Sequence, residues 1–128
     1  MTLNREQILK AKDSKTETVE VPEWGGTVEV KSMSGSERDA YEQSLIDVET
    51  RKPSLANIRA KLGAMTLVDD DGKLLFSEKD VRALGKKSAA ALDRICDVAQ
   101  SLNGLSNEDM EELAKNSKGA QKEENGSG

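Results

Sequence analysis

The residues whose spacing best suits chemistry form the acidic stretch LVDDDGKLLFSE at positions 67–78. With its glycine at the sixth place of an EF-hand calcium loop, Asp69, Asp71 and Glu78 take the third, fifth and twelfth places, which supply oxygen ligands. The first place is Leu67, and an alkyl side chain offers no oxygen to a cation. We therefore favour a solvated Asp-Gly turn, and we predict that the protein uses no metal and no cofactor.

Groups that enzymes combine for catalysis are missing. The sequence contains no histidine and no glycine-rich phosphate loop after an expected strand, and its carboxylates do not coincide with an apolar pocket that could separate their pKa values. Cys96 is the only cysteine and has apolar neighbours at helical spacing, which favours a buried core thiol over a reactive one. The sequence thus predicts a protein that is not an enzyme.

Composition favours a protein-binding role. The chain has 24 acidic and 19 basic residues and a net charge of −5, which argues against nucleic acid as a partner. Only 26 of its 128 residues are Leu, Ile, Val or Phe, so the core is thin and we expect a partner or a second copy to cover apolar surface. No apolar run is long enough to cross a bilayer, and residues 1–20 lack the pattern of a signal peptide, so we expect a soluble intracellular protein without membrane contact.

The element that must organise the rest is a helix over 88–103. Its apolar residues recur at three- and four-residue steps, which places them on one stripe: Leu92, Ile95, Cys96, Ala99 and Leu102. Ser88 is suited to cap its beginning and Gly104 to end it. We expect this stripe to pack against a second helix over 55–68, through Ile58, Leu62 and Met65.

A β-hairpin is predicted over about 16–32. Val19 and Val21 alternate with polar residues before the turn segment Pro22-Glu23-Trp24-Gly25-Gly26, and Val28 and Val30 alternate after it. Trp24 at the tip is the natural anchor for a partner, because exposed tryptophans are frequent interface hot spots; it could equally fold back onto the helices. The predicted partner-binding residues are Pro22, Trp24, Gly25, Gly26, Val28 and Val30.

The remaining elements are mostly helical. Capping boxes at Asn4 and Ser34 predict helices over 4–12 and from 34 onward, the latter with Tyr41, Leu45 and Val48 on one stripe. Further helices are expected over 78–84 and 107–116, with a short extended segment at 73–76 and a disordered polar tail over 117–128. We therefore predict a mainly α fold: one domain over 1–116 with five to six helices and one N-terminal hairpin.

The run VEVPEWGGTVEVKSMSGSERDAYE at 19–42 resembles the N-terminal part of tail assembly chaperones of long-tailed, non-contractile (siphovirus-type) bacteriophages. The acidic turn and the expected helices over 55–115 are similar to the rest of that family. The most specific parts are Val-Pro-Glu-Trp-Gly-Gly and Glu37-Arg38-Asp39. The resemblance implies a non-enzymatic protein of the host bacterial cytoplasm, absent from the mature virion.

The resemblance also implies partners. Such chaperones bind and solubilise the tape-measure protein and help recruit tail-tube subunits, so a homo-oligomer and a hairpin that serves one of these contacts are expected. A frameshift-extended form would reach the tail-tube protein, and Ala114-Lys115-Asn116 is where the peptide permits a slippery heptamer. The alternative is a small acidic adaptor or inhibitor of a single host protein, which should stay monomeric.

Overall fold

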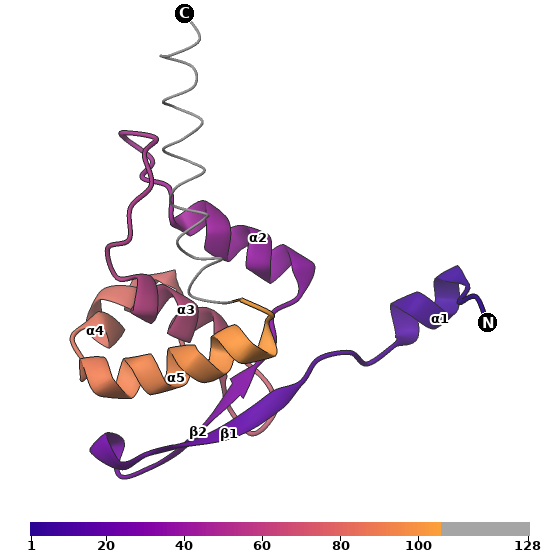
Figure 1. Ribbon diagram of the computed structural model, residues 1–128, viewed down its shortest axis with the longest axis horizontal. Coiled ribbons are helices and arrows are strands. Elements are labelled where there is room, and N and C mark those ends of the chain that lie inside the picture. Colours follow the sequence, from indigo (N-terminus) through magenta and orange to yellow (C-terminus); the bar gives the residue numbers. More distant parts are fainter. Residues whose placement is uncertain (106–128) are drawn as a thin grey trace, which may run out of the picture.

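The computed structural model describes residues 1–105 (Figure 1). Within them, five α-helices accompany a three-stranded antiparallel sheet. In chain order the elements are α1 (Arg5–Lys10), β1 (Thr16–Val21), the 3-10 turn η1 (Pro22–Trp24), β2 (Gly26–Lys31), α2 (Gly35–Ser44), α3 (Ile58–Thr66), β3 (Leu67–Val68), the 3-10 turn η2 (Glu78–Asp80), α4 (Val81–Gly85) and α5 (Ala89–Leu102).

The predicted mainly α fold with a single hairpin is wrong: the fold is α/β. The hairpin exists, with Val19 paired to Val28, but its second strand also pairs with β3, where Val30 lies opposite Leu67. The sheet order is β1-β2-β3, so β2 is hydrogen-bonded on both sides. Leu74 forms a further isolated bridge to Val68, in place of a separate extended segment.

The third strand escaped sequence reasoning because α3 passes into it without a loop. Leu67 and Val68 continue the apolar character of the helix, and two residues are too few to display alternation. The helix ends where Leu67 turns extended, at φ −79° and ψ 124°. The buried Thr66 hydroxyl donates to the Leu62 carbonyl at 2.7 Å, so this buried polar side chain has a hydrogen-bond partner.

The core lies between the sheet and the pair α3 and α5, which pack against each other as predicted. Leu62, Ile95 and Ala99 are buried, and Ile58 and Met65 pack against the same cluster. Ser88 caps α5 by accepting from the Ala91 amide at 3.3 Å, and Gly104 is left-handed at φ 64°. The Asn103 side chain then accepts from the Met33 amide at 2.5 Å, which fastens the end of α5 to the segment before α2.

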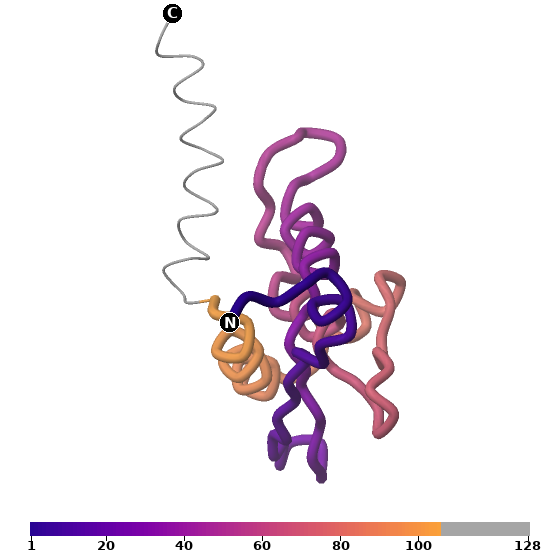
Figure 2. The backbone as a smooth tube through the Cα atoms, turned by 90° about the vertical axis from the view of Figure 1, so that its right-hand side faces the viewer, coloured from indigo at the N-terminus to yellow at the C-terminus, as the bar shows by residue number. Residues whose placement is uncertain are grey.

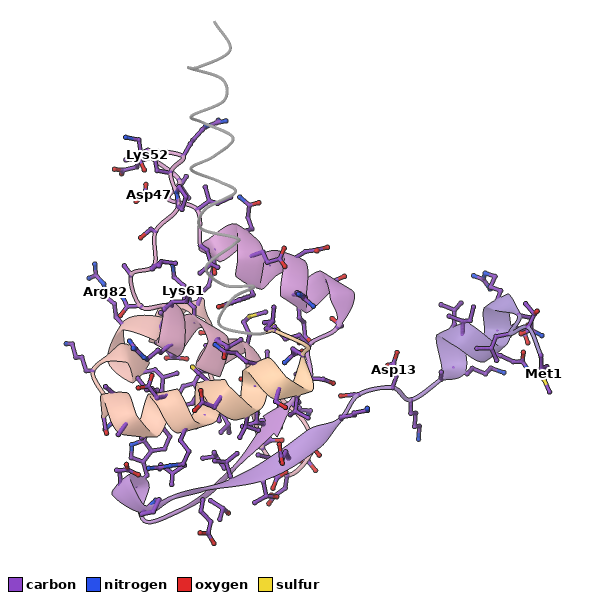
Figure 3. All side chains as sticks on the ribbon, viewed as in Figure 1. Met1, Asp13, Asp47, Lys52, Lys61 and Arg82 are labelled. Carbon is purple, nitrogen blue, oxygen red and sulfur yellow. The ribbon has the colours of Figure 1, made fainter. Side chains whose placement is uncertain are left out.

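Two predicted helices are shorter than expected. The capping boxes at Asn4 and Ser34 are both present, but α2 ends at Ser44 and α3 begins only at Ile58. Residues 46–57 form a loop between them, closed by a bridge from Ile46 to Pro53. Val48 and Leu55, predicted on helical stripes, are therefore exposed. Asp47 and Lys52 mark the end of this loop, which projects from the body of the molecule (Figure 3).

The N-terminal segment also projects from the body. α1 is joined to β1 only through residues 11–15, and in Figure 1 it stands clear of every other element. Lys15 at its base donates its amide to the Ser32 hydroxyl at 2.9 Å, beside the start of α2. The view in Figure 2 places α1 in front of the body, with the hairpin tip and the 46–57 loop at opposite ends. The predicted helix over 107–116, the tail over 117–128 and the slippery site at 114–116 lie outside the described residues.

Candidate partner-binding site

The hairpin tip is shaped by proline at its beginning and glycine at its end. Pro22 opens η1 with a φ that its ring already restricts, and Gly25 closes it in the left-handed region at φ 73°. The Gly25 amide donates to the Pro22 carbonyl at 3.1 Å. The turn lies where the sequence predicted it, over Pro22 to Gly25, and Gly26 already belongs to β2.

An ion pair ties this tip to α5. The Arg94 guanidinium donates to both carboxylate oxygens of Glu23, at 2.7 and 3.0 Å. The hydrogen bonds from Arg94 hold the pKa of Glu23 down at about 2, well below its usual value. Sequence reasoning missed the pair, since Arg94 lies on the polar face of α5 and its partner is 71 residues away.

The six predicted partner-binding residues divide between surface and core. Pro22, Gly25 and Gly26 are exposed at the tip. Trp24 and Val28 are half-buried and pack against the core, and Val30 is completely buried. Trp24 therefore serves the core as well as the surface, and Val30 has no exposed side chain to offer a partner.

A shallow groove runs beside the tip, between β1 and α5. It measures about 450 Å³ and is lined by residues 17–20, Pro22, Arg94 and Val98, and we call it the tip groove. Val19 and Val98 give it an apolar floor, and Glu17 and Glu20 also line it. No other strand of the described residues pairs with the outer edge of β1.

A second groove lies on another side of the molecule, between α2, α3 and the segment that leads into α4. It measures about 320 Å³ and its apolar lining includes Tyr41, Met65, Leu74, Phe76 and Val81. We call it the apolar groove. Burial raises the pKa of Tyr41, in keeping with the apolar surroundings. Residues of α2, of α3, of the segment 74–78 and of α4 build this groove, so no single local motif in the sequence indicates it.

The candidate calcium stretch is a closed turn. The Asp69 carboxylate accepts from the amides of Asp71 and Lys73, at 2.8 and 3.0 Å, and Gly72 is left-handed at φ 80°. These are the contacts of a side-chain-stabilised Asp-Gly turn, as predicted. Among residues 1–105, no three His, Cys, Asp or Glu side chains are grouped to hold a metal ion.

Cys96 is a core residue, as predicted. Its thiol is buried and lies 3.5 Å from the Arg59 carbonyl. Burial raises the pKa of the thiol to about 12, so it stays protonated at neutral pH. None of the helices in the described part of the chain is long and apolar enough to cross a membrane.

Comparison with known proteins gives one family and one fold. The family model described as phage tail assembly chaperone matches residues 4–116. Among solved structures, the chain is similar to the tail assembly chaperone of bacteriophage HK97, with 24% sequence identity and a TM-score of 0.55 over 80% of this chain and 95% of that one. At this identity the likeness establishes a shared fold. No curated protein matches the chain.

Proposed function

The chain belongs to the phage tail assembly chaperone family, and from that premise we propose that it binds and solubilises the tape-measure protein and helps recruit tail-tube subunits. Members of this family are non-enzymatic adaptors, so the prediction that the protein is not an enzyme is confirmed. Family membership also favours a role in phage tail assembly over the alternative function, which is binding or inhibition of a single host protein.

The observation that supports the proposal most is the hairpin tip, which the ion pair of Glu23 with Arg94 holds beside the tip groove. Glu23 and Arg94 hold the tip against α5, so a partner binds a surface that is already ordered and loses less conformational entropy. Pro22, Gly25 and Gly26 leave the tip backbone accessible. A helix of the tape-measure protein that carries an apolar stripe would lie in this groove over Val19 and Val98.

Charge defines the complementary partner further. Glu17 and Glu20 border the tip groove, and both side chains are exposed. A tape-measure helix with basic residues beside its apolar stripe would meet them, and such contacts weaken as salt rises. The same acidic rim disfavours acidic partners.

Co-expression with the tape-measure protein of the same phage tests the proposal. The wild-type chain should raise the soluble fraction of the tape-measure protein, and the double change Glu17→Lys and Glu20→Lys should remove most of that gain. The matched control is Asp39→Lys with Glu49→Lys, which alters net charge equally at exposed sites away from the tip groove. If the wild-type chain gives no gain in solubility, the chaperone function is excluded.

Recruitment of tail-tube subunits is proposed to use a longer, frameshifted product. The change of reading frame at Ala114-Lys115-Asn116 lies beyond the described residues, so the nucleotide sequence is its test. An open −1 frame that continues past Gly128 supports the extended form, and stop codons throughout codons 110–128 in that frame contradict it.

We place the protein in the host cytoplasm during tail assembly, and outside the finished particle. Mass spectrometry of purified virions should therefore detect tail-tube and tape-measure peptides but none from this chain, whereas lysates of infected cells should contain it. Its self-association is part of the same proposal, because a chaperone for a long partner must act in several copies.

A further inference from the structure

α1 and the residue before its cap carry apolar side chains that no other element of residues 1–105 covers. Leu3 is 59% exposed, Ile8 58% and Leu9 67%, and no residue of this helix is buried. Leu3 precedes the cap and Ile8 is the fourth helical residue, the two positions that form a hydrophobic staple. In Figure 3 the side chains of this segment, between Met1 and Asp13, point into open space.

A helix this short does not persist alone. α1 has six residues, and isolated helices below roughly 12–15 residues are marginal in water. It nevertheless has a complete capping box, in which Asn4 and Gln7 exchange hydrogen bonds of 2.9 Å. The local sequence therefore specifies a helix whose stability must come from a surface outside it.

Charge points to the surface that this helix fits. Residues 1–15 contain four basic and two acidic side chains, although the whole chain has a net charge of −5. The segment 69–80, which supplies Leu74, Phe76 and Glu78 to the apolar groove, contains five acidic residues and two lysines. Lys61 also lines that groove, but its ammonium is engaged by the Ser44 carbonyl at 2.7 Å. A basic N-terminal segment with apolar side chains thus has an apolar groove, to which the acidic segment 69–80 contributes one side, to receive it.

We propose that α1 of one chain docks in the apolar groove of a second copy of this chain. The base of the arm is fixed at Lys15 beside the start of α2, whereas the groove is lined by the second half of α2, at Ala40, Tyr41 and Ser44. In Figure 1 the N-terminal arm, residues 1–15, extends away from its own body. The contact joins two different surfaces, so one copy donates its arm and accepts another.

Crosslinking between separate chains tests the docking directly. A chain with Ile8→Cys is mixed with a chain with Glu78→Cys, which lies in the groove lining, and treated with a short bismaleimide. The native Cys96 is buried and protonated, so it reacts slowly, and the unsubstituted chain gives the background. The crosslinked dimer should form at least about tenfold faster than with Glu49→Cys on the 46–57 loop, because docking raises the effective concentration of the thiols.

Two further measurements test whether the apolar side chains of α1 make the contact and whether the groove belongs to a second copy or to the same chain. Ile8→Ser with Leu9→Ser should raise the dissociation constant for self-association, measured by sedimentation, by roughly tenfold to a hundredfold, since two apolar side chains lose their burial. The control Lys10→Ser with Lys12→Ser should change it less, and mainly at low salt. An unchanged dissociation constant for the apolar double variant overturns the proposal.

The other measurement uses one chain with both Ile8→Cys and Glu78→Cys. If the crosslink forms within that single chain at high dilution, the arm occupies the groove of its own chain. The proposal that it docks in a second copy is then wrong. None of these experiments contains the tape-measure protein, so failure of arm docking and failure of the chaperone function are read separately.

Discussion

Glu23 at the hairpin tip accepts two hydrogen bonds from Arg94 of α5, at 2.7 and 3.0 Å, although the two residues lie 71 positions apart in the chain. Because the folded pKa of Glu23 is about 2, against 4.5 for the unperturbed group, the ionised form is favoured in the folded state. The pair therefore contributes stability above pH 4.5 that is lost as the pH falls towards 2.

The corresponding prediction compares wild type with Glu23→Gln. The variant should melt at a lower temperature at pH 7, and the difference should shrink between pH 4.5 and 2, because wild-type Glu23 is then protonated as well. Thermal melting followed by circular dichroism over this range measures it. Glu20→Gln, three residues earlier in β1 and also exposed, is the control. A difference that stays constant with pH contradicts the role of the ion pair.

Ile95→Asp should be severely destabilising. Ile95 is completely buried in the α5 stripe, and the variant places a carboxylate there without a partner. We expect a loss of more than about 4 kcal/mol in the free energy of unfolding, which urea titration measures. Asp97→Asn, on the exposed face of the same helix, should change it by less than about 0.5 kcal/mol. An Ile95→Asp chain with unaltered stability refutes the packing of α5.

Gly85→Ala should destabilise the start of α3 through Asn57. A Cβ at position 85 would lie 2.5 Å from the Asn57 side-chain oxygen, and Asn57 itself is left-handed at φ 57°. Asn57 is exposed, so its side chain can rotate away from the added methyl group, and this displacement should cost about 0.5–1.5 kcal/mol. Asn57→Gly removes the obstructing atoms and suits the positive φ, so the double variant should recover most of the loss. Simple additivity of the two changes would show that the contact does not matter.

Trp24→Ala should affect both stability and binding. Trp24 is half-buried against the core, so we expect the free energy of unfolding to fall by about 2 kcal/mol. At temperatures where the variant is still folded, it should retain helical circular dichroism and pull down less tape-measure protein than wild type. Trp24→Phe, which keeps an apolar ring, is the control. Equal recovery of the tape-measure protein by Trp24→Ala removes the tip from the binding surface.

Most local signals in the sequence were read correctly, although two helical stripes were extended too far, to Val48 and Leu55. Of the long-range contacts, the packing of α3 against α5 was predicted, but most others were not. The stripe from Leu92 to Ala99 and the capping boxes at Asn4 and Ser34 depend on residues within one or two turns, so they are visible in the sequence. β3 depends on pairing between Leu67 and Val30, 37 positions apart, and nothing local distinguishes it from the end of a helix. Because β3 was not recognised, a mainly α fold was predicted where the structure has an α/β fold.

The candidate site divides in the same way. Pro22 and Gly25 made the hairpin tip visible in the sequence. Proline restricts φ and glycine allows a positive φ, so both are typical turn residues. The burial of Val30, the contact of Glu23 with Arg94 and the apolar groove arise only when distant segments meet. Alternation identified β1 and β2, but it did not show that β2 is the central strand of the sheet.

The absence of a loop between α3 and β3 fixes the distance between the two proposed contact surfaces. β2 leads from the hairpin tip and pairs with β3, and β3 continues directly from α3, which lines the apolar groove. Tip and groove therefore move as one body, and the segment 11–15 is the adjustable part of the connection. A row of copies joined arm to groove would present its tips at a constant spacing, and inserting residues into that segment would lengthen the repeat.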